Sequence, residues 1–197
     1  MADELNVGDK IPPFFVKDHE GFNVSDQDVI GTPMVIFFYP KDGTETCTKE
    51  VCAFRDNMLK FDEKQVLLVG VSPDSVDTHK DFIEKNKLEL SLLSDEKKDM
   101  CRMFGALDDK DEVVRTTFVI NSQGQVKWME KPVKVDGHVD RVLQALEEHC
   151  KNELARYDDF EGDYAEFLKG NLELTDEEKK LEKEIMKEFG IKEGDFK

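Results

Sequence analysis

Two of the four cysteines in this chain stand close together. Cys47 and Cys52 lie five positions apart in the segment "YPKDGTETCTKEVCAFRD", residues 39–56. A deprotonated thiol is a strong nucleophile, and two thiols that meet can form a disulfide and be reduced again. The pair therefore indicates thiol redox chemistry.

The sequence around Cys47 predicts that its thiol lies at the start of a helix. The strand-forming run "PMVIFFY" ends just before Pro40, a short polar loop follows, and a helical pattern begins within one turn of Cys47. Unpaired N–H groups at a helix N-terminus favour the thiolate over the thiol. Thr44 or Thr46 can cap this helix, and Thr44 also aims its hydroxyl toward the sulfur.

The spacing of Cys47 and Cys52 has a geometric consequence. On an ideal helix, residues five positions apart have Cα atoms about 8.6 Å from each other. A disulfide usually needs a Cα separation below about 7 Å. We therefore expect the first turns of this helix to unwind when the two sulfurs join.

The elements that position these thiols alternate along the first 150 residues. Strands are expected at 33–39 and 65–72, and a β-hairpin at 114–131. Helices are expected from 47 to about 61, at 75–86, at 95–104 and from 138 to about 151. This order predicts an α/β fold, a thioredoxin-like three-layer sandwich, with extra strands at 12–16 and 21–25.

The composition changes after Cys150, which suggests a domain of residues 1–150 and an extension of residues 151–197. The extension has a net charge of about −6 and aromatic residues at helical intervals. The segment "TDEE", residues 175–178, is typical of a capping box that opens a helix. We expect an acidic amphipathic helical extension; the alternative is a mobile tail that binds a partner.

Charge and hydropathy exclude several classes of partner. The net charge of −17 argues against nucleic acids and anionic membranes, because most of the surface would repel phosphate. The chain has no apolar run of membrane-spanning length and no signal-peptide pattern at its start. Four irregularly spaced cysteines do not resemble a disulfide framework. We expect a cytoplasmic protein in a reducing compartment.

Three segments carry a resemblance to a known family. "PKDGTETC", residues 40–47, resembles the Pro-x-x-x-Thr-x-x-Cys motif of peroxiredoxins. "CTKEVCAFRD" resembles the two-cysteine helix of the bacterioferritin comigratory protein (PrxQ) subfamily, and "RTTFVI", residues 115–120, its arginine-bearing strand. The resemblance covers residues 3–150. The tripeptide Thr44-Glu45-Thr46 departs from the usual Thr-Pro-Gly, and the acidic extension is also unusual.

The resemblance implies a thiol-dependent peroxidase of the atypical two-cysteine kind. Cys47 would attack hydrogen peroxide or an organic hydroperoxide and become a sulfenic acid. Cys52 would condense with it to an intramolecular disulfide, which thioredoxin or a similar dithiol would reduce. No metal, flavin or haem is required. The protein would be a monomer or a weak homodimer.

The same resemblance implies supporting roles for residues near Cys47. Arg115 and Thr44, with the backbone N–H of Cys47, would stabilise the two peroxide oxygens as their bond lengthens. Pro40 would shield the sulfur from water. By similarity to the family, Glu50 would hold Arg115 in position, and its place one turn after Cys47 puts it on the correct helix face.

Other interpretations of these residues remain open. Cys47 or Cys52 could be a buried, unreactive thiol, and Arg115 could be a surface residue. A non-enzymatic peroxide sensor could use the same disulfide to switch partner binding. A thioredoxin-type disulfide reductase fits less well, since it would want C-x-x-C and a proline before the "TFVI" strand.

The remaining cysteines and the histidines show no pattern of a second site. Cys101 and Cys150 sit at inward helical positions, which favours a role in the core. The histidines are scattered, with no pair at ligand spacing near the cysteines, so a zinc site is not expected and we interpret them as surface or packing residues. They are His19, His79, His138 and His149.

Overall fold

The computed structural model describes residues 5–154, which belong to the first of two units of the chain, residues 1–155 and 156–197. The predicted helical extension therefore lies outside the described residues, except for a helical turn at 151–154. No helix among the described residues is long and apolar enough to cross a membrane.

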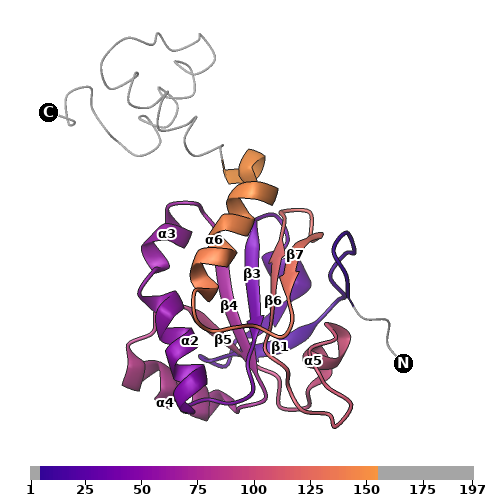
Figure 1. The fold of residues 1–197 in the computed structure, drawn as a ribbon. Coiled ribbons are helices and arrows are strands. Elements are labelled where there is room, and N and C mark those ends of the chain that lie inside the picture. Colours follow the sequence, from indigo (N-terminus) through magenta and orange to yellow (C-terminus); the bar gives the residue numbers. More distant parts are fainter. Residues whose placement is uncertain (1–4, 155–197) are drawn as a thin grey trace, which may run out of the picture. The chain divides into compact units, whose positions relative to one another are not determined.

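A single mixed sheet of seven strands forms the centre of the described unit (Figure 1). Its order is β2-β1-β5-β4-β3-β6-β7. Strands β3, β4 and β5 are parallel, and the neighbours at both sides are antiparallel. The strands are β1 Phe15–Asp18, β2 Asn23–Ser25, β3 Met34–Phe38, β4 Leu67–Ser72, β5 Ser91–Ser94, β6 Thr116–Ile120 and β7 Val126–Glu130.

The continuous apolar runs form the middle of the sheet because both faces of the sheet are covered. Along β3, successive side chains alternate between two hydrophobic clusters, one on each face. Val35 and Phe37 belong to the first cluster and Ile36 and Phe38 to the second. All four are fully buried.

Helices cover both faces of the sheet, which gives the predicted three layers, and more helices lie on one face than on the other. One cluster joins the sheet to side chains of α2, α3, α4 and α6, and the other joins it to α1, α5 and the N-terminal segment. The helices are α1 Asp26–Val29, α2 Glu45–Arg55, α3 Met58–Asp62, α4 Val76–Asn86, α5 Asp99–Met103 and α6 His138–His149. The predicted thioredoxin-like fold is confirmed.

A tight contact between rings sets the position of α2 on the sheet. Phe37 of β3 stacks on Phe54 of α2 with ring centroids 4.6 Å apart. The Phe37 ring also crosses Gly70 of β4, where an added Cβ would lie 2.7 Å from the ring. A side chain at position 70 would push this ring away, so the glycine allows the helix that carries Cys47 to lie close to the sheet.

Several elements of the structure differ from the prediction. The single helix expected from 47 to about 61 is two helices, since α2 ends at Arg55 and α3 starts at Met58. The helix expected at 95–104 starts later, because the Asp95 side chain accepts hydrogen bonds from the N–H groups of Met100 and Cys101 and is not itself helical. Strand β5 was not predicted, and its four residues follow α4 closely.

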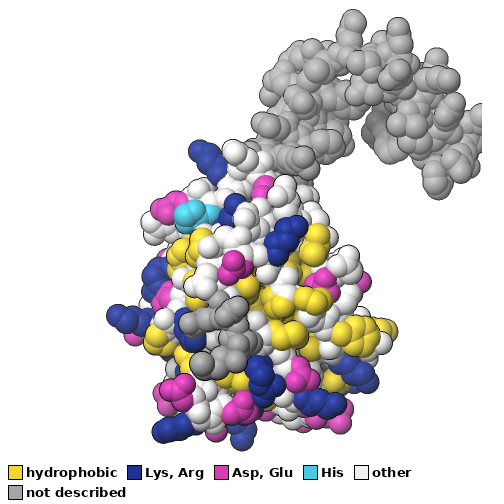
Figure 2. Space-filling view, turned by 90° about the vertical axis from the view of Figure 1, so that its right-hand side faces the viewer, with side chains coloured by type: hydrophobic (Ala, Val, Ile, Leu, Met, Phe, Trp, Pro, Cys, Tyr) yellow, Lys and Arg dark blue, Asp and Glu magenta, His cyan; other side chains and the backbone are white. Residues whose placement is uncertain are grey.

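The surface charge is mixed rather than uniformly negative on the face in Figure 2. Acidic and basic side chains are interspersed there with hydrophobic ones. Large exposed hydrophobic residues include Phe15 and Phe22 in the β1–β2 region. The net charge of −17 therefore says little about the local field at any one site on the surface.

Candidate active site

Cys47 lies in the first turn of α2, as the sequence predicts. Thr44 is the N-cap, and its hydroxyl oxygen accepts a hydrogen bond from the Cys47 N–H at 3.4 Å. The Cys47 side chain is only 1% exposed. Thr46, the other candidate cap, is inside the helix. The cap sets the direction of the first turn and therefore the position of the thiol.

A buried polar network holds the loop between β3 and α2. The Tyr39 hydroxyl donates to one carboxylate oxygen of Asp42 at 2.7 Å, and His79 Nδ1 lies 2.7 Å from the other. The backbone N–H of Asp42 donates to Asp74 at 2.7 Å. Burial and the neighbouring Asp42 carboxylate raise the pKa of Tyr39 well above its usual range. This loop, which carries Pro40 and Thr44, is thereby anchored to α4.

Arg115 meets Cys47 from the other side. It stands directly before β6, whose Thr116 pairs with Phe38 at the end of β3. Its Nη2 donates to the Cys47 sulfur at 3.0 Å, and its Nε donates to Glu50 Oε2 at 3.2 Å. The backbone oxygen of Arg115 also accepts a hydrogen bond from the Val133 N–H. Glu50 holds the guanidinium and Val133 holds the backbone of Arg115, so that a positive charge lies beside the sulfur.

Glu50 contacts a second basic group that sequence reasoning missed. Its Oε1 lies 3.2 Å from His138 Nδ1, and both side chains are almost fully buried, at 0% and 1% exposure. The sequence indicates only a surface or packing role for His138. Helical periodicity marks it only as the start of α6, and no local signal identifies its partner.

A cavity opens beside the arginine. It has a volume of about 570 Å³ and is lined by both charged and apolar side chains. The lining includes Arg115, Lys49, Val133 and Val135. Lys49 pairs with Asp136 at 2.5 Å at this place. The cavity lies next to the guanidinium that contacts Cys47, but Cys47 itself is buried and does not line it.

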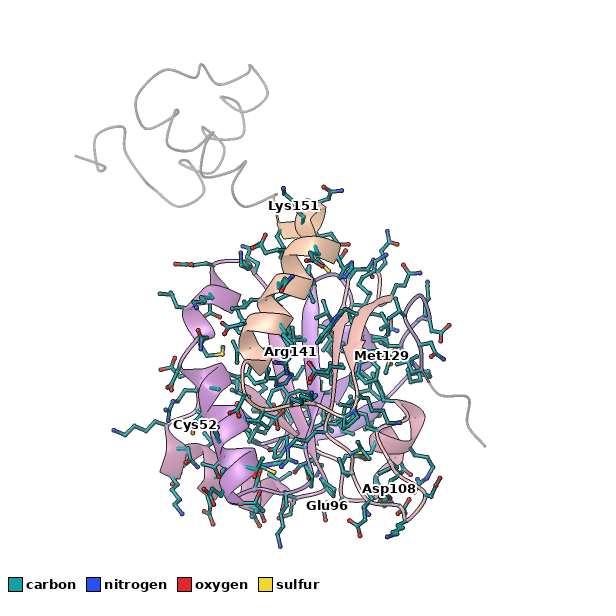
Figure 3. The ribbon with its side chains drawn as sticks, in the orientation of Figure 1. Cys52, Glu96, Asp108, Met129, Arg141 and Lys151 are labelled. Atoms are coloured by element: carbon teal, nitrogen blue, oxygen red, sulfur yellow. The ribbon has the colours of Figure 1, made fainter. Side chains whose placement is uncertain are left out.

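Cys52 lies further along α2 and is half-buried against the hydrophobic cluster (Figure 3). All four cysteines are free thiols in this structure. Cys47 and Cys52 are both in the intact helix α2, so the ideal separation of about 8.6 Å between their Cα atoms applies. The structure brings Thr44, Glu50 and Arg115 to Cys47, while Pro40 is half-buried in the loop before them.

Cys101 and Cys150 are in the core, as expected. Both are buried, at 0% and 1% exposure. Burial, with the nearby Asp95 carboxylate, raises the pKa of Cys101 far above that of an ordinary thiol. Burial raises the pKa of Cys150 to about 11. Both groups therefore remain thiols at neutral pH, in a state that reacts slowly.

Among residues 5–154, no three His, Cys, Asp or Glu side chains are grouped so that they could hold a metal ion. The buried histidines instead contact carboxylates. His79 pairs with Asp42 and His138 faces Glu50. His79 holds Asp42 in the loop that leads to Thr44, and His138 lies beside Glu50 of α2, the helix that carries Cys47.

Comparisons with known proteins agree on one family. The model of the AhpC/TSA family matches residues 7–129. A putative peroxiredoxin bcp of Coxiella burnetii is 38% identical over 149 residues, which cover 72% of this chain and 99% of that protein. Peroxiredoxin Bcp of Escherichia coli is 34% identical, over 74% of this chain and 98% of that protein.

Solved structures give the same result. A structure of the bacterioferritin comigratory protein of Xanthomonas campestris is described as giving insights into its alkyl peroxide reduction activity. It matches with a TM-score of 0.66 at 33% identity, over 68% of this chain and 90% of that one.

Proposed function

This chain belongs to the AhpC/TSA family and is a peroxiredoxin, a thiol peroxidase, and we propose that Cys47 and Cys52 carry out its reaction. The observation that supports Cys47 most directly is its contact with Arg115 Nη2, at 3.0 Å. The Cys47 thiolate would attack one peroxide oxygen and the O–O bond would break. The sulfur becomes a sulfenic acid, and the other oxygen leaves as water or an alcohol after taking a proton.

Ionisation of the thiol alone would explain only a small part of the rate. An ordinary cysteine is a few per cent thiolate at neutral pH, so complete ionisation would increase the rate by roughly 30-fold. The larger contribution would come from groups that stabilise the two oxygens as negative charge develops on the departing one. Arg115, which is held by Glu50, would take this role together with the Thr44 hydroxyl, and Pro40 would limit the access of water.

Cys52 would then resolve the sulfenic acid. Its thiolate would attack the Cys47 sulfur and displace hydroxide, which leaves as water once protonated, and a disulfide would form. Because α2 separates the two residues in the reduced state, its first turns would have to unwind. An external dithiol, which we propose to be thioredoxin, would reduce the disulfide by exchange. A reducing compartment such as the cytoplasm would provide it.

We propose hydrogen peroxide and organic hydroperoxides as substrates. The alkyl peroxide activity named for the Xanthomonas campestris relative supports the second class. The cavity beside Arg115, with Val133 and Val135 in its wall, offers apolar surface for an alkyl group. Because the proposed disulfide is internal, a monomer would be sufficient for turnover.

Turnover with thioredoxin, thioredoxin reductase and NADPH tests this proposal. The wild-type protein should consume many equivalents of peroxide, and Cys47→Ser should consume none. Cys52→Ser should react once and then stall. Consumption of a single equivalent by the wild type would instead indicate a sensor, and steady turnover by Cys47→Ser would refute the assignment of the nucleophile.

Mass spectrometry would identify the pairing. After one equivalent of peroxide, the wild type should lose two hydrogens, located in a peptide that contains residues 47–52. Cys101→Ser is the matched control, because this buried thiol should not contribute. A disulfide that includes Cys101 or Cys150 would contradict the proposed role of Cys52.

A further inference from the structure

The buried histidine at the start of α6 has a role that the peroxidase mechanism does not yet include. Resting on the proposed function of Cys47 and Arg115, we propose that His138 is a positioning residue for Arg115 and acts through Glu50. It would keep one carboxylate oxygen of Glu50 occupied, so that Arg115 Nη2 remains directed at the sulfur and the peroxide.

The first observation is the division of the Glu50 carboxylate between two bases. Oε2 accepts a hydrogen bond from Arg115 Nε at 3.2 Å, whereas Oε1 faces His138 Nδ1, also at 3.2 Å. Glu50 Oε1 and both ring nitrogens of His138 are buried without an aligned hydrogen bond from the described part of the chain. A buried carboxylate oxygen is costly unless positive charge or an N–H group faces it. The imidazole of His138 is the group that faces Oε1 at hydrogen-bonding distance.

The second observation is that the His138 ring is held in place. It packs edge-on against Phe54, with ring centroids 5.1 Å apart and planes at 79°. Phe54 lies on α2, four residues after Glu50, so both contact α6 from the same side of that helix. The preceding Gly137 has a φ of +68°, which lets the chain turn sharply into α6. The imidazole therefore stays against Glu50.

The charges around His138 indicate that Glu50 is its main partner. Glu130 of β7 also interacts electrostatically with His138. However, Glu130 accepts two hydrogen bonds of 2.8 Å from Arg141 of α6, so its charge is already matched. Glu50 of α2 faces both His138 and Arg115.

Removal of His138 would release the Glu50 oxygen to a competing partner. A carboxylate and a guanidinium favour a bidentate pair with two parallel hydrogen bonds. Arg115 now gives Nε to Glu50 and Nη2 to Cys47. With Oε1 unoccupied, the carboxylate would also attract Nη2 and draw it away from the sulfur. His138 thus prevents an ion pair that would weaken the contact of Arg115 with the reacting atoms.

Two amide substitutions separate this role from simple packing. In His138→Asn, the side-chain amide nitrogen takes the place of Nδ1 and still faces Glu50. In His138→Gln, the amide nitrogen takes the place of Nε2, on the far side of the ring. The rate of the first oxidation of Cys47 by hydrogen peroxide, measured without reductant, should fall by about 10-fold in the glutamine variant. It should stay within about 3-fold of the wild type in the asparagine variant.

The glutamine substitution should also be tested together with Arg115→Ala. If His138 acts through Arg115, His138→Gln should have almost no further effect in that background. His149→Gln, an exposed histidine on the same helix, is the matched control and should react like the wild type. Equal rates for the asparagine and glutamine variants, or an undiminished loss in the Arg115→Ala background, would overturn the inference.

Different results would contradict the proposed function of Cys47 and the role of His138. If the wild type does not oxidise Cys47 with peroxide at all, the proposed function is wrong and this inference falls with it. If the wild type reacts and only the predicted differences among the His138 variants are absent, the proposed function stands and His138 is a packing residue. Thermal unfolding of each variant verifies that the comparison is made between folded proteins.

Discussion

Arg115 Nη2 lies 3.0 Å from the sulfur of Cys47, although 68 residues separate the two along the chain. The antiparallel pairing of β3 with β6 brings them together, because Phe38 pairs with Thr116 at the end of the strand that leads to the Cys47 loop. The same arginine binds Glu50, one turn after Cys47 on α2. The pairing of β3 with β6 positions Arg115, and helix α2 positions Glu50, so that the guanidinium and the carboxylate meet beside the Cys47 sulfur.

Replacing Arg115 should slow the first chemical step. Arg115→Ala removes a donor that contacts the sulfur and that would stabilise the developing charge on the peroxide, so we expect the oxidation of Cys47 to slow by about 100- to 1,000-fold. Stopped-flow measurement of thiol loss in a single turnover gives this rate directly. Arg102→Ala, which removes an exposed arginine of α5, is the control and should react normally. A rate for Arg115→Ala within 3-fold of the wild type would show that the contact has no catalytic role.

Disulfide formation should open only part of α2. The cap at its start is a long hydrogen bond of 3.4 Å, whereas Arg55 at its end donates to the Asn86 oxygen of α4 at 2.5 Å. We therefore expect amide exchange to increase in residues 46–52 after oxidation and to change little beyond Arg55. Hydrogen exchange with mass spectrometry measures this. The Cys52→Ser protein, treated with the same peroxide, should not show the increase; identical exchange in both redox states of the wild type would argue against unwinding.

The buried Cys150 should make stability depend on alkaline pH. Its pKa is raised by burial from 9.0 to about 11 in the folded protein, so the folded state keeps the proton longer than the unfolded state. The resulting stabilisation is complete below about pH 9 and is lost as the pH rises toward 11. Two pKa units correspond to about 3 kcal/mol.

Urea unfolding at pH 8 and at pH 10.5 measures this contribution. The free energy of unfolding of the wild type should fall more steeply with pH than that of Cys150→Ala, which lacks the thiol. Lysine and tyrosine side chains titrate in both proteins, so the difference between them isolates Cys150. Parallel pH profiles would mean that the thiol ionises equally in both states.

His79→Ala should destabilise the protein strongly. His79 and the carboxylate of Asp42 are paired at 2.7 Å with 0% and 3% of their side chains exposed, so the substitution leaves a buried carboxylate with one partner fewer. We expect a loss of about 3–5 kcal/mol in the free energy of unfolding. The double variant His79→Ala/Asp42→Asn should recover part of the loss, because the unpaired charge is gone. If the double variant is the less stable of the two, packing rather than charge explains the effect.

Much of the fold and part of the site follow from local signals in the sequence. The apolar runs at 33–39 and 65–72 become β3 and β4, since a strand covered on both faces must be apolar throughout. The order of runs and helical patterns is sufficient for the thioredoxin-like arrangement. The position of Cys47 behind a capping threonine is equally local, and Thr44 caps the helix as expected.

The partners of the thiol depend on the tertiary structure. The sequence indicates Arg115 and Glu50 only through a family resemblance, and it predicts no role for His138 and His79 beyond the surface or packing. Hydrophobic periodicity encodes which side of an element faces the core, but it carries no information about which distant residue will lie opposite. Strand pairing and the packing of α6 on α2 decide that, and they bring the Arg115 guanidinium to Cys47 and Glu50 and the His138 imidazole to Glu50.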